Sequence, residues 1–198
     1  ELLRCEYNTL TSLTVSKTNN TALKDVYCGG NQISGAAMTN LVNGLPTVTG
    51  DHGFNVCDDT QKTDNVITPA QVKTAADKGW MVLKFNGSWA SPYAGFDPIA
   101  INETNFPDAN FRYFVRDKAI NTNEDDYLSE KEVLAVTKLS VGSKEISNMK
   151  GIEYFTALQE LICGHNHGLT SLNVSANKAL TKLDCSACGL TSLDVSQH

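Results

Sequence analysis

The sequence predicts an α/β fold, a leucine-rich repeat solenoid in which short parallel strands stack on one another. One observation is a seven-residue string, Leu-Thr-Ser-Leu-x-Val-Ser, that occurs at Leu10–Ser16, Leu169–Ser175 and Leu190–Ser196. A second is that the preceding residues repeat as well, as Leu158-Gln-Glu-Leu-Ile-Cys163 and Leu180-Thr-Lys-Leu-Asp-Cys185. The general unit is therefore L-x-x-L-x-C-x-x-N-x-L-x-x-L-x-V-S, and Leu169 and Leu190 lie 21 residues apart.

Each unit is too small to bury its own apolar face, so its Leu, Val and Cys side chains are expected to point inward and stack on the next unit. The cysteines expected in one inward slot are Cys5, Cys28, Cys163 and Cys185. Cysteines in such a slot behave as small buried hydrophobic residues. Neighbouring rungs also lie within disulfide distance, so pairing stays an alternative to free thiols. The Asn position of the unit holds Asn8, Asn31 and Cys188.

Three segments are predicted along the chain. Residues 1–94 form the end of one repeat block with a strand-helix-strand closing cap, in which Met38, Leu41 and Val42 have helical spacing and Thr68-Pro69 begins a second helix. Residues 95–103 are a linker, because a stretch rich in Pro, Gly and Ser precedes and enters them. Residues 104–198 form a helical-hairpin cap and a second repeat block.

The loop of that hairpin has the donor spacing of an EF-hand calcium loop. The six predicted ligands are Asn121, Asn123, Asp125, Tyr127 through its carbonyl, Ser129 and Glu132. Calcium is thus the one cofactor that the sequence suggests. An alternative without metal is equally concrete, since Ser129 and Glu132 also form a capping box for the next helix. The neutral Asn121 at place one, and Asp126 where Gly is usual, favour that alternative.

Composition and motif content exclude several classes of function. The net charge is -6 and no basic cluster exceeds two residues, which argues against nucleic-acid binding. No apolar run is long enough for a transmembrane helix. No nucleophile, phosphate-loop or zinc-protease motif occurs, so the chain is predicted not to be an enzyme. Because the chain begins and ends within repeats, we expect it to be part of a longer protein.

A partner surface is expected on the outward residues of the strands, which alternate with the buried ones. The predicted residues are Arg4, Glu6, Asp25, Tyr27, Glu160, Ile162, Lys182 and Asp184. Mixed charges with an occasional Tyr or Ile suit a protein or glycan partner, and a purely solvated face is the alternative. Trp89 and Tyr93 are candidates for stacking on a sugar ring. Unsatisfied ends of the repeat blocks favour end-to-end self-contact between copies.

The Leu-Thr-Ser-Leu-x-Val-Ser repeats with inward Cys, the Gly79–Val82 strand and the Asn105–Phe111 hairpin resemble secreted or surface leucine-rich repeat proteins of the Bacteroidetes type. In that family, internalin-like repeats follow an EF-hand-like cap. The resemblance implies a curved solenoid at the bacterial surface or secreted from the cell. It implies a non-catalytic module for protein interaction or adhesion. A carbohydrate-binding surface module and a structural spacer are the alternatives.

Overall fold

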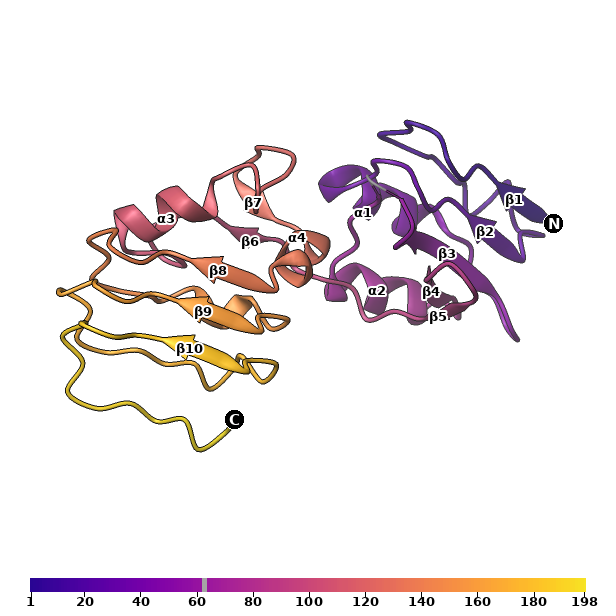
Figure 1. The fold of residues 1–198 in the computed structure, drawn as a ribbon. Coiled ribbons are helices and arrows are strands. Elements are labelled where there is room, and N and C mark those ends of the chain that lie inside the picture. The colour runs from indigo at the N-terminus through magenta and orange to yellow at the C-terminus, as the bar shows by residue number, and fades with distance from the viewer. Residues whose placement is uncertain (62–63) are drawn as a thin grey trace. The chain divides into compact units, whose positions relative to one another are not determined.

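The computed structural model describes residues 1–61 and 64–198. The chain divides into two compact units, residues 1–97 and 98–198, and each is built on its own ladder of parallel strands (Figure 1). None of the described helices has the length and hydrophobicity needed to cross a membrane.

Unit 1 contains a five-stranded sheet in the order β1-β2-β3-β4-β5. Its strands are β1 (Leu2–Arg4), β2 (Asp25–Tyr27), β3 (Gly53–Asp58), β4 (Met81–Phe85) and β5 (Ala90–Pro92). The first four are parallel and β5 returns antiparallel to β4. The row Leu3, Val26, Phe54 and Val82 lies in register across the parallel strands, and its side chains belong to the core of the unit.

Two helices cover the core of unit 1, as the sequence predicts. Helix α1 (Gly35–Gly44) buries Met38, Leu41 and Val42. Helix α2 (Pro69–Ala76) begins at a complete capping box, in which Thr68 accepts from the Gln71 main chain and the Gln71 side chain accepts from the Thr68 main chain. These longer strand-helix segments extend the short rungs at the start of the chain.

Lys78, which follows α2, closes the carboxyl end of α1. Its Nζ donates to the carbonyl oxygens of Val42 at 2.8 Å, Asn43 at 2.6 Å and Leu45 at 3.0 Å. Helix ends leave carbonyl groups without intrahelical partners, and a cation is favoured there. One side chain therefore joins the two helices at the edge of the core.

Unit 2 begins with a cap and continues into short rungs. The cap consists of β6 (Ile99–Ala100), α3 (Ala109–Val115), β7 (Tyr127–Leu128) and α4 (Glu130–Ala135). The rungs contain β8 (Lys138–Ser140), a 3-10 helix (Ile152–Tyr154), β9 (Glu160–Ile162) and β10 (Lys182–Asp184). All three rung strands are parallel, with Leu139, Leu161 and Leu183 in register.

Asp108 connects the cap to the first rung. One carboxylate oxygen accepts from the Phe111 N–H at 2.9 Å and caps α3. The other accepts from the main chain and hydroxyl of Ser147, both at 2.8 Å, and from Asn148 N–H at 3.2 Å. Burial alone would raise the pKa of Asp108, but these hydrogen bonds outweigh it and lower the pKa.

The boundary between the two units falls between Asp97 and Pro98, inside the segment predicted as a linker (residues 95–103), and this segment forms hydrogen bonds within each unit. The Phe96 N–H donates to the Ile67 carbonyl and so belongs to unit 1. Ile99 and Ala100 form β6, which pairs antiparallel with β7 across the cap loop of unit 2. The Ser- and Pro-rich passage before it is also structured, since Ala90–Pro92 is strand β5. Composition alone did not reveal these pairings, because each involves only two or three residues.

The inward cysteine slot is confirmed. Cys28 and Cys163 are fully buried, whereas Cys5 and Cys185 are half-buried because they lie in the terminal rungs of the two units. Burial raises the pKa of the Cys163 thiol to about 12, and it raises the pKa of Cys28 as well. The four cysteines of this slot carry free thiols.

Candidate functional site

The outward strand faces are held in register by asparagine side chains between the rungs. Asn166 is fully buried and donates to the carbonyls of Val141 and Cys163, while its own oxygen accepts from Lys144 and Ile146 N–H, all at 2.7–3.0 Å. Asn31 does the same in unit 1: it donates to the carbonyls of its own rung and the preceding one, and accepts from Leu10. Each asparagine thus joins its rung to the rung before it.

Sequence reasoning missed Asn65 as one of these asparagines, whereas it placed Cys188 correctly at the Asn position of its rung. Asn65 accepts from Ile33 N–H at 2.8 Å and donates to the carbonyls of Cys28 and Val56, each at 2.7 Å. Asn65 lies in a segment longer than the 21-residue unit, so a search at that period does not find it. Cys188 stands three residues after Cys185, in the same slot as Asn166, and its thiol makes one hydrogen bond, to the Cys163 carbonyl at 3.3 Å. The rung of Cys188 is therefore joined to the preceding rung by fewer side-chain hydrogen bonds than the rung of Asn166.

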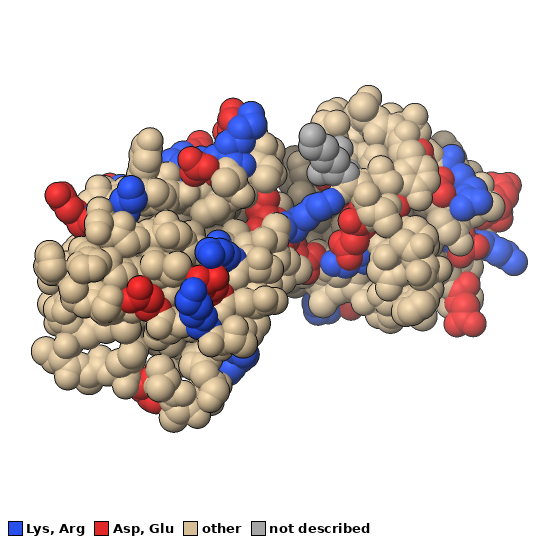
Figure 2. Space-filling view, in the orientation of Figure 1, with Lys and Arg blue, Asp and Glu red and all other residues tan. Residues whose placement is uncertain are grey.

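The outward face of unit 2 consists largely of charges that neutralise one another. Glu160 on β9 lies between Lys138 on β8 at 3.0 Å and Lys182 on β10 at 2.7 Å. Hydrogen bonds from Lys182 and then Lys138 lower the pKa of Glu160. Figure 2 shows opposite charges side by side over these strands. The next outward row contains Ser140, Ile162 and Asp184.

The outward face of unit 1 has a different composition. Arg4, Tyr27, Asn55 and Leu83 form one row in register across β1 to β4. The Arg4 guanidinium lies 4.7 Å from the centre of the Tyr27 ring and 3.1 Å from Glu6. The row thus presents a cation, an aromatic ring and an aliphatic side chain, while the Asn55 amide within it is buried.

All eight predicted partner residues are exposed or half-buried, whereas β3 of unit 1 is buried from Phe54 to Asp58. Two of the eight also bind the main chain: the Asp25 carboxylate accepts from the Gly53 N–H at 3.0 Å, and the Asp184 carboxylate accepts from the Ser186 N–H at 3.0 Å. The structure places four of the eight in unit 1 and four in unit 2, on two separate sheets.

In the 121–132 loop, the oxygens predicted to bind calcium are used by the protein itself. One oxygen of Glu132 accepts from the Thr122 main chain at 2.7 Å, the Thr122 hydroxyl at 2.9 Å and the Asn123 N–H at 3.4 Å. The other accepts from the main chain and the hydroxyl of Ser129, both at 2.9 Å. The Asp125 carboxylate accepts from Tyr127 N–H and from the Asn123 amide. The capping box of Ser129 and Glu132 is complete.

The backbone of this loop also differs from the predicted EF-hand loop. The left-handed residue is Glu124, with φ of 58°, and not Asp126, which occupies the place where the sharp turn was expected. Asp126 instead pairs with Arg116 at 2.7 Å. Asn121 donates to the Asp125 carbonyl, and its own oxygen is buried without a partner, which is the one feature that fits a cation. In this geometry the residues do not form a calcium cage.

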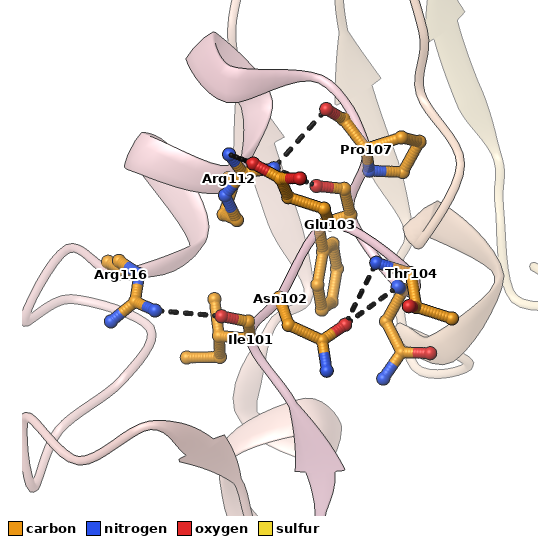
Figure 3. A network of polar contacts seen from close by, with 9 residues as sticks. Ile101, Asn102, Glu103, Thr104, Pro107, Arg112 and Arg116 are labelled. Atoms are coloured by element: carbon orange, nitrogen blue, oxygen red, sulfur yellow. Dashed lines mark hydrogen bonds and ion pairs between the residues drawn. The ribbon is translucent and has the colours of Figure 1, made fainter.

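Two arginines of the cap hold the segment before α3 in place, as Figure 3 shows. Arg116 donates to the Ile101 carbonyl at 2.8 Å, and Arg112 donates to the carbonyls of Phe106 at 2.6 Å and Pro107 at 3.2 Å. Because Arg116 bonds both Ile101 and Asp126, it connects this segment to the 121–132 loop. Asp126, at place six of the loop, is therefore explained by its ion pair with Arg116.

The acidic patch around Asp58 and Asp64 does not form a solvated turn. Asp58 and Asn65 are buried, and Asp64 accepts from the N–H groups of Gly30, Asn65 and Asp58. Burial raises the pKa of Asp64 to about 6, despite these hydrogen bonds, which lower it. The patch thus anchors the Gly30 turn. Among the described residues, no three His, Cys, Asp or Glu side chains lie close enough to hold a metal ion.

Comparison with known proteins supports the presence of leucine-rich repeats in this chain. No protein-family model matches the chain. A segment of 72 residues, 36% of the chain, is 40% identical to Internalin J of Listeria monocytogenes, and this match spans 8% of the length of that protein. A solved structure titled "Functional domain of InlJ from Listeria monocytogenes includes a cysteine ladder" shares 30% identity over 52% of this chain and 27% of its own, with a TM-score of 0.35. The sequence similarity supports the assignment of this chain's rungs as internalin-like leucine-rich repeats.

Proposed function

We propose that this chain is a non-catalytic leucine-rich repeat module of a bacterial surface or secreted protein, and that it mediates adhesion by binding a protein partner. The observation that carries the proposal is the outward row Arg4, Tyr27, Asn55 and Leu83 of unit 1. Arg and Tyr are enriched among the residues that dominate binding energies at protein interfaces. A rigid parallel ladder presents them with little conformational entropy left to lose.

Unit 2 is the weaker candidate for the binding surface. A partner that contacts Glu160 would first have to compete with the two lysines that already bind it, and exposed ion pairs contribute little binding energy. In unit 1, Arg4 pairs with Glu6, but the half-buried side chains of Tyr27 and Leu83 can contact a partner without breaking an ion pair. We therefore assign recognition to unit 1 and a supporting role to the rungs of unit 2.

A binding measurement on cultured epithelial cells tests the proposal. Fluorescently labelled chain should bind in a saturable way, and binding should be lost after the cells are treated with protease and kept after they are treated with glycosidases. Absence of saturable binding to any cell type tested would reject adhesion and leave a structural spacer as the function.

Binding of a glycan is the second candidate, because one observation favours it. Trp89 is 66% exposed at the turn between β4 and β5, and an exposed indole ring is a suitable stacking surface for a sugar. Tyr93 is less suitable, since Lys84 lies 4.5 Å above its ring. Binding that is lost after glycosidase treatment, and weakened by Trp89→Ala, would replace the protein partner with a glycan.

We also propose that the 121–132 loop closes without calcium, because the Glu132 carboxylate already accepts five hydrogen bonds from Thr122, Asn123 and Ser129 of the loop. Thermal melting of the chain should give the same midpoint in excess calcium and in chelator. A rise of several degrees in calcium, abolished by Asn121→Ala, would show that the buried oxygen of Asn121 binds the ion and that the loop rearranges.

A further inference from the structure

Strand β8 has an open edge on the side opposite β9. Its neighbours Thr137 and Val141 bond toward β9, since the Thr137 carbonyl accepts from Glu160 N–H and the Val141 N–H donates to Ile162. Main-chain groups alternate sides along a strand, so the N–H and C=O groups of Lys138 and Ser140 point the other way. Among the described residues neither has a main-chain partner on that side, and both are exposed.

A cavity of about 280 Å³ lies beside this edge. Its apolar lining comes from Phe114 on α3, Ile120 in the following turn, Val136 before β8 and Leu139 on β8 itself. Ile120, Val136 and Leu139 are almost fully buried and form the floor, whereas Asp117 and Lys138 lie at its rim. Apolar lining and unpaired peptide groups therefore meet in one place.

We propose that this groove, defined by Phe114, Ile120, Val136 and Leu139 next to the β8 edge, is a second binding site, which takes an extended segment of a partner polypeptide as a fourth strand. Two residues along a strand are about 6.6 Å apart. The free groups of Lys138 and Ser140 therefore match alternate residues of an added strand. Strand addition obtains affinity from main-chain hydrogen bonds and specificity from pockets for alternate side chains.

The chemistry selects a peptide over other occupants. A helix or a small apolar molecule would fill the cavity but leave the N–H groups of Lys138 and Ser140 without partners from the ligand. The rim carries one charge of each sign, so no strongly charged ligand is favoured. This site is independent of the outward row of unit 1 and goes beyond the proposed adhesion surface.

The probe is a capped nonapeptide, Lys-Thr-Val-Thr-Leu-Thr-Val-Thr-Lys, and its control is the same peptide with alternate amides N-methylated on one edge. Isothermal titration with the full chain should give saturable binding of the unmodified peptide, with a dissociation constant below about 1 mM. The N-methylated control should bind at least roughly tenfold more weakly, because it loses the main-chain hydrogen bonds. Amide hydrogen exchange at Lys138 and Ser140 should slow when the unmodified peptide is present.

Two variants test the assignment from the protein side. Ser140→Pro removes one edge N–H, which proline tolerates at the open side of an edge strand, and Ser140→Ala is the matched control that keeps it. Should Ser140→Pro fail to fold, Ala119→Phe narrows the cavity from an exposed position. Ser140→Pro or Ala119→Phe should weaken peptide binding roughly tenfold and Ser140→Ala should leave it unchanged. No binding at 1 mM, or equal binding of the N-methylated peptide, would overturn the proposal.

Discussion

Units 1 and 2 share one inward pattern and differ in everything that faces outward. In both, a row of Leu, Val or Phe and a Cys slot face the core, and a buried Asn joins consecutive rungs. Outward, unit 2 places Glu160 between two lysines, whereas unit 1 presents Tyr27 under Arg4. The comparison shows that stacking constrains only the inward half of each rung, so the outward half is free to acquire a partner.

The largest expected effect comes from the rung asparagines, and it tests whether the two units are built alike. Asn166→Ala in unit 2 and Asn65→Ala in unit 1 each leave several buried main-chain groups without partners, so each unit should lose about 3 kcal/mol of stability. Denaturant unfolding measures this. Tryptophan fluorescence reports unit 1 alone, because Trp80 and Trp89 are the two tryptophans of the chain.

Circular dichroism reports both units in the same experiment. Asn65→Ala should shift the fluorescence transition, and Asn166→Ala should shift only the circular dichroism transition. Asn173→Ala, at an exposed position, is the matched control and should change neither. A fluorescence shift in Asn166→Ala would contradict two independent units.

The fold was largely predictable from the sequence. Stacked strands bury one side chain at regular intervals, and the regular spacing of Leu and Cys in the sequence indicates these buried positions. Asn166 and Asn65 were harder to place. An extra residue follows Asn166 before Leu169, and a longer helical segment precedes Asn65, so a fixed period does not find them. The antiparallel strands β5 and β6 were missed because pairing partners of two or three residues leave no periodic signal.

A second prediction concerns helices α1 and α2 of unit 1. Lys78→Met removes three hydrogen bonds from a cation to the end of α1 and should destabilise unit 1 by about 2 kcal/mol. Lys73→Met is the control, since Lys73 makes only an exposed ion pair with Asp77. Fluorescence-detected unfolding of the two variants measures the difference. Equal stability would show that Lys78 does not hold α1 and α2 together.

A third prediction is that the two units respond oppositely to pH. The folded pKa of Asp64 in unit 1, about 6, lies above the usual 3.8. Its contribution to stability is therefore complete below pH 3.8 and is lost as the pH rises through 6, and the part lost between pH 5 and pH 7 is on the order of 1–2 kcal/mol. In unit 2 the pKa of Asp108 is lowered, so its contribution is present above pH 3.8 and is lost at more acidic pH.

Unfolding of the whole chain at pH 5 and pH 7 checks this prediction. The fluorescence transition of unit 1 should occur at lower denaturant concentration at pH 7, and Asp64→Ala should remove the dependence. A unit 1 transition that moves to higher denaturant concentration between pH 5 and pH 7 would contradict a raised pKa of Asp64.

The smallest expected effect is a gain in stability. Cys188→Asn places the usual asparagine in a rung where the thiol makes a single hydrogen bond, so unit 2 should gain about 1 kcal/mol. Cys188→Ala is the control and should be neutral or slightly destabilising. The circular dichroism transition measures both. No gain in Cys188→Asn would show that the last rung differs from the others in more than this side chain.

The candidate sites were less predictable than the fold. Alternation along the strands indicated which residues face outward. Their spacing did not show that Lys138 and Lys182 both pair with Glu160, or that Arg4 lies over the Tyr27 ring. The calcium donors have the spacing of an EF-hand loop, but that spacing did not show that the same oxygens accept hydrogen bonds within the loop. The hydrogen bonds of Glu132 and the turn at Glu124 depend on three-dimensional contacts that a one-dimensional motif does not record.

The most direct measurement compares register-equivalent residues of the two units. Tyr27 and Ile162 both lie immediately before an inward cysteine, so Tyr27→Ala and Ile162→Ala remove outward side chains from the same position of the rung. In the epithelial-cell binding assay, Tyr27→Ala should weaken binding at least roughly tenfold, as expected for a residue that anchors an interface. Ile162→Ala should leave binding unchanged. The reverse order, or equal loss in both variants, would contradict the assignment of recognition to unit 1.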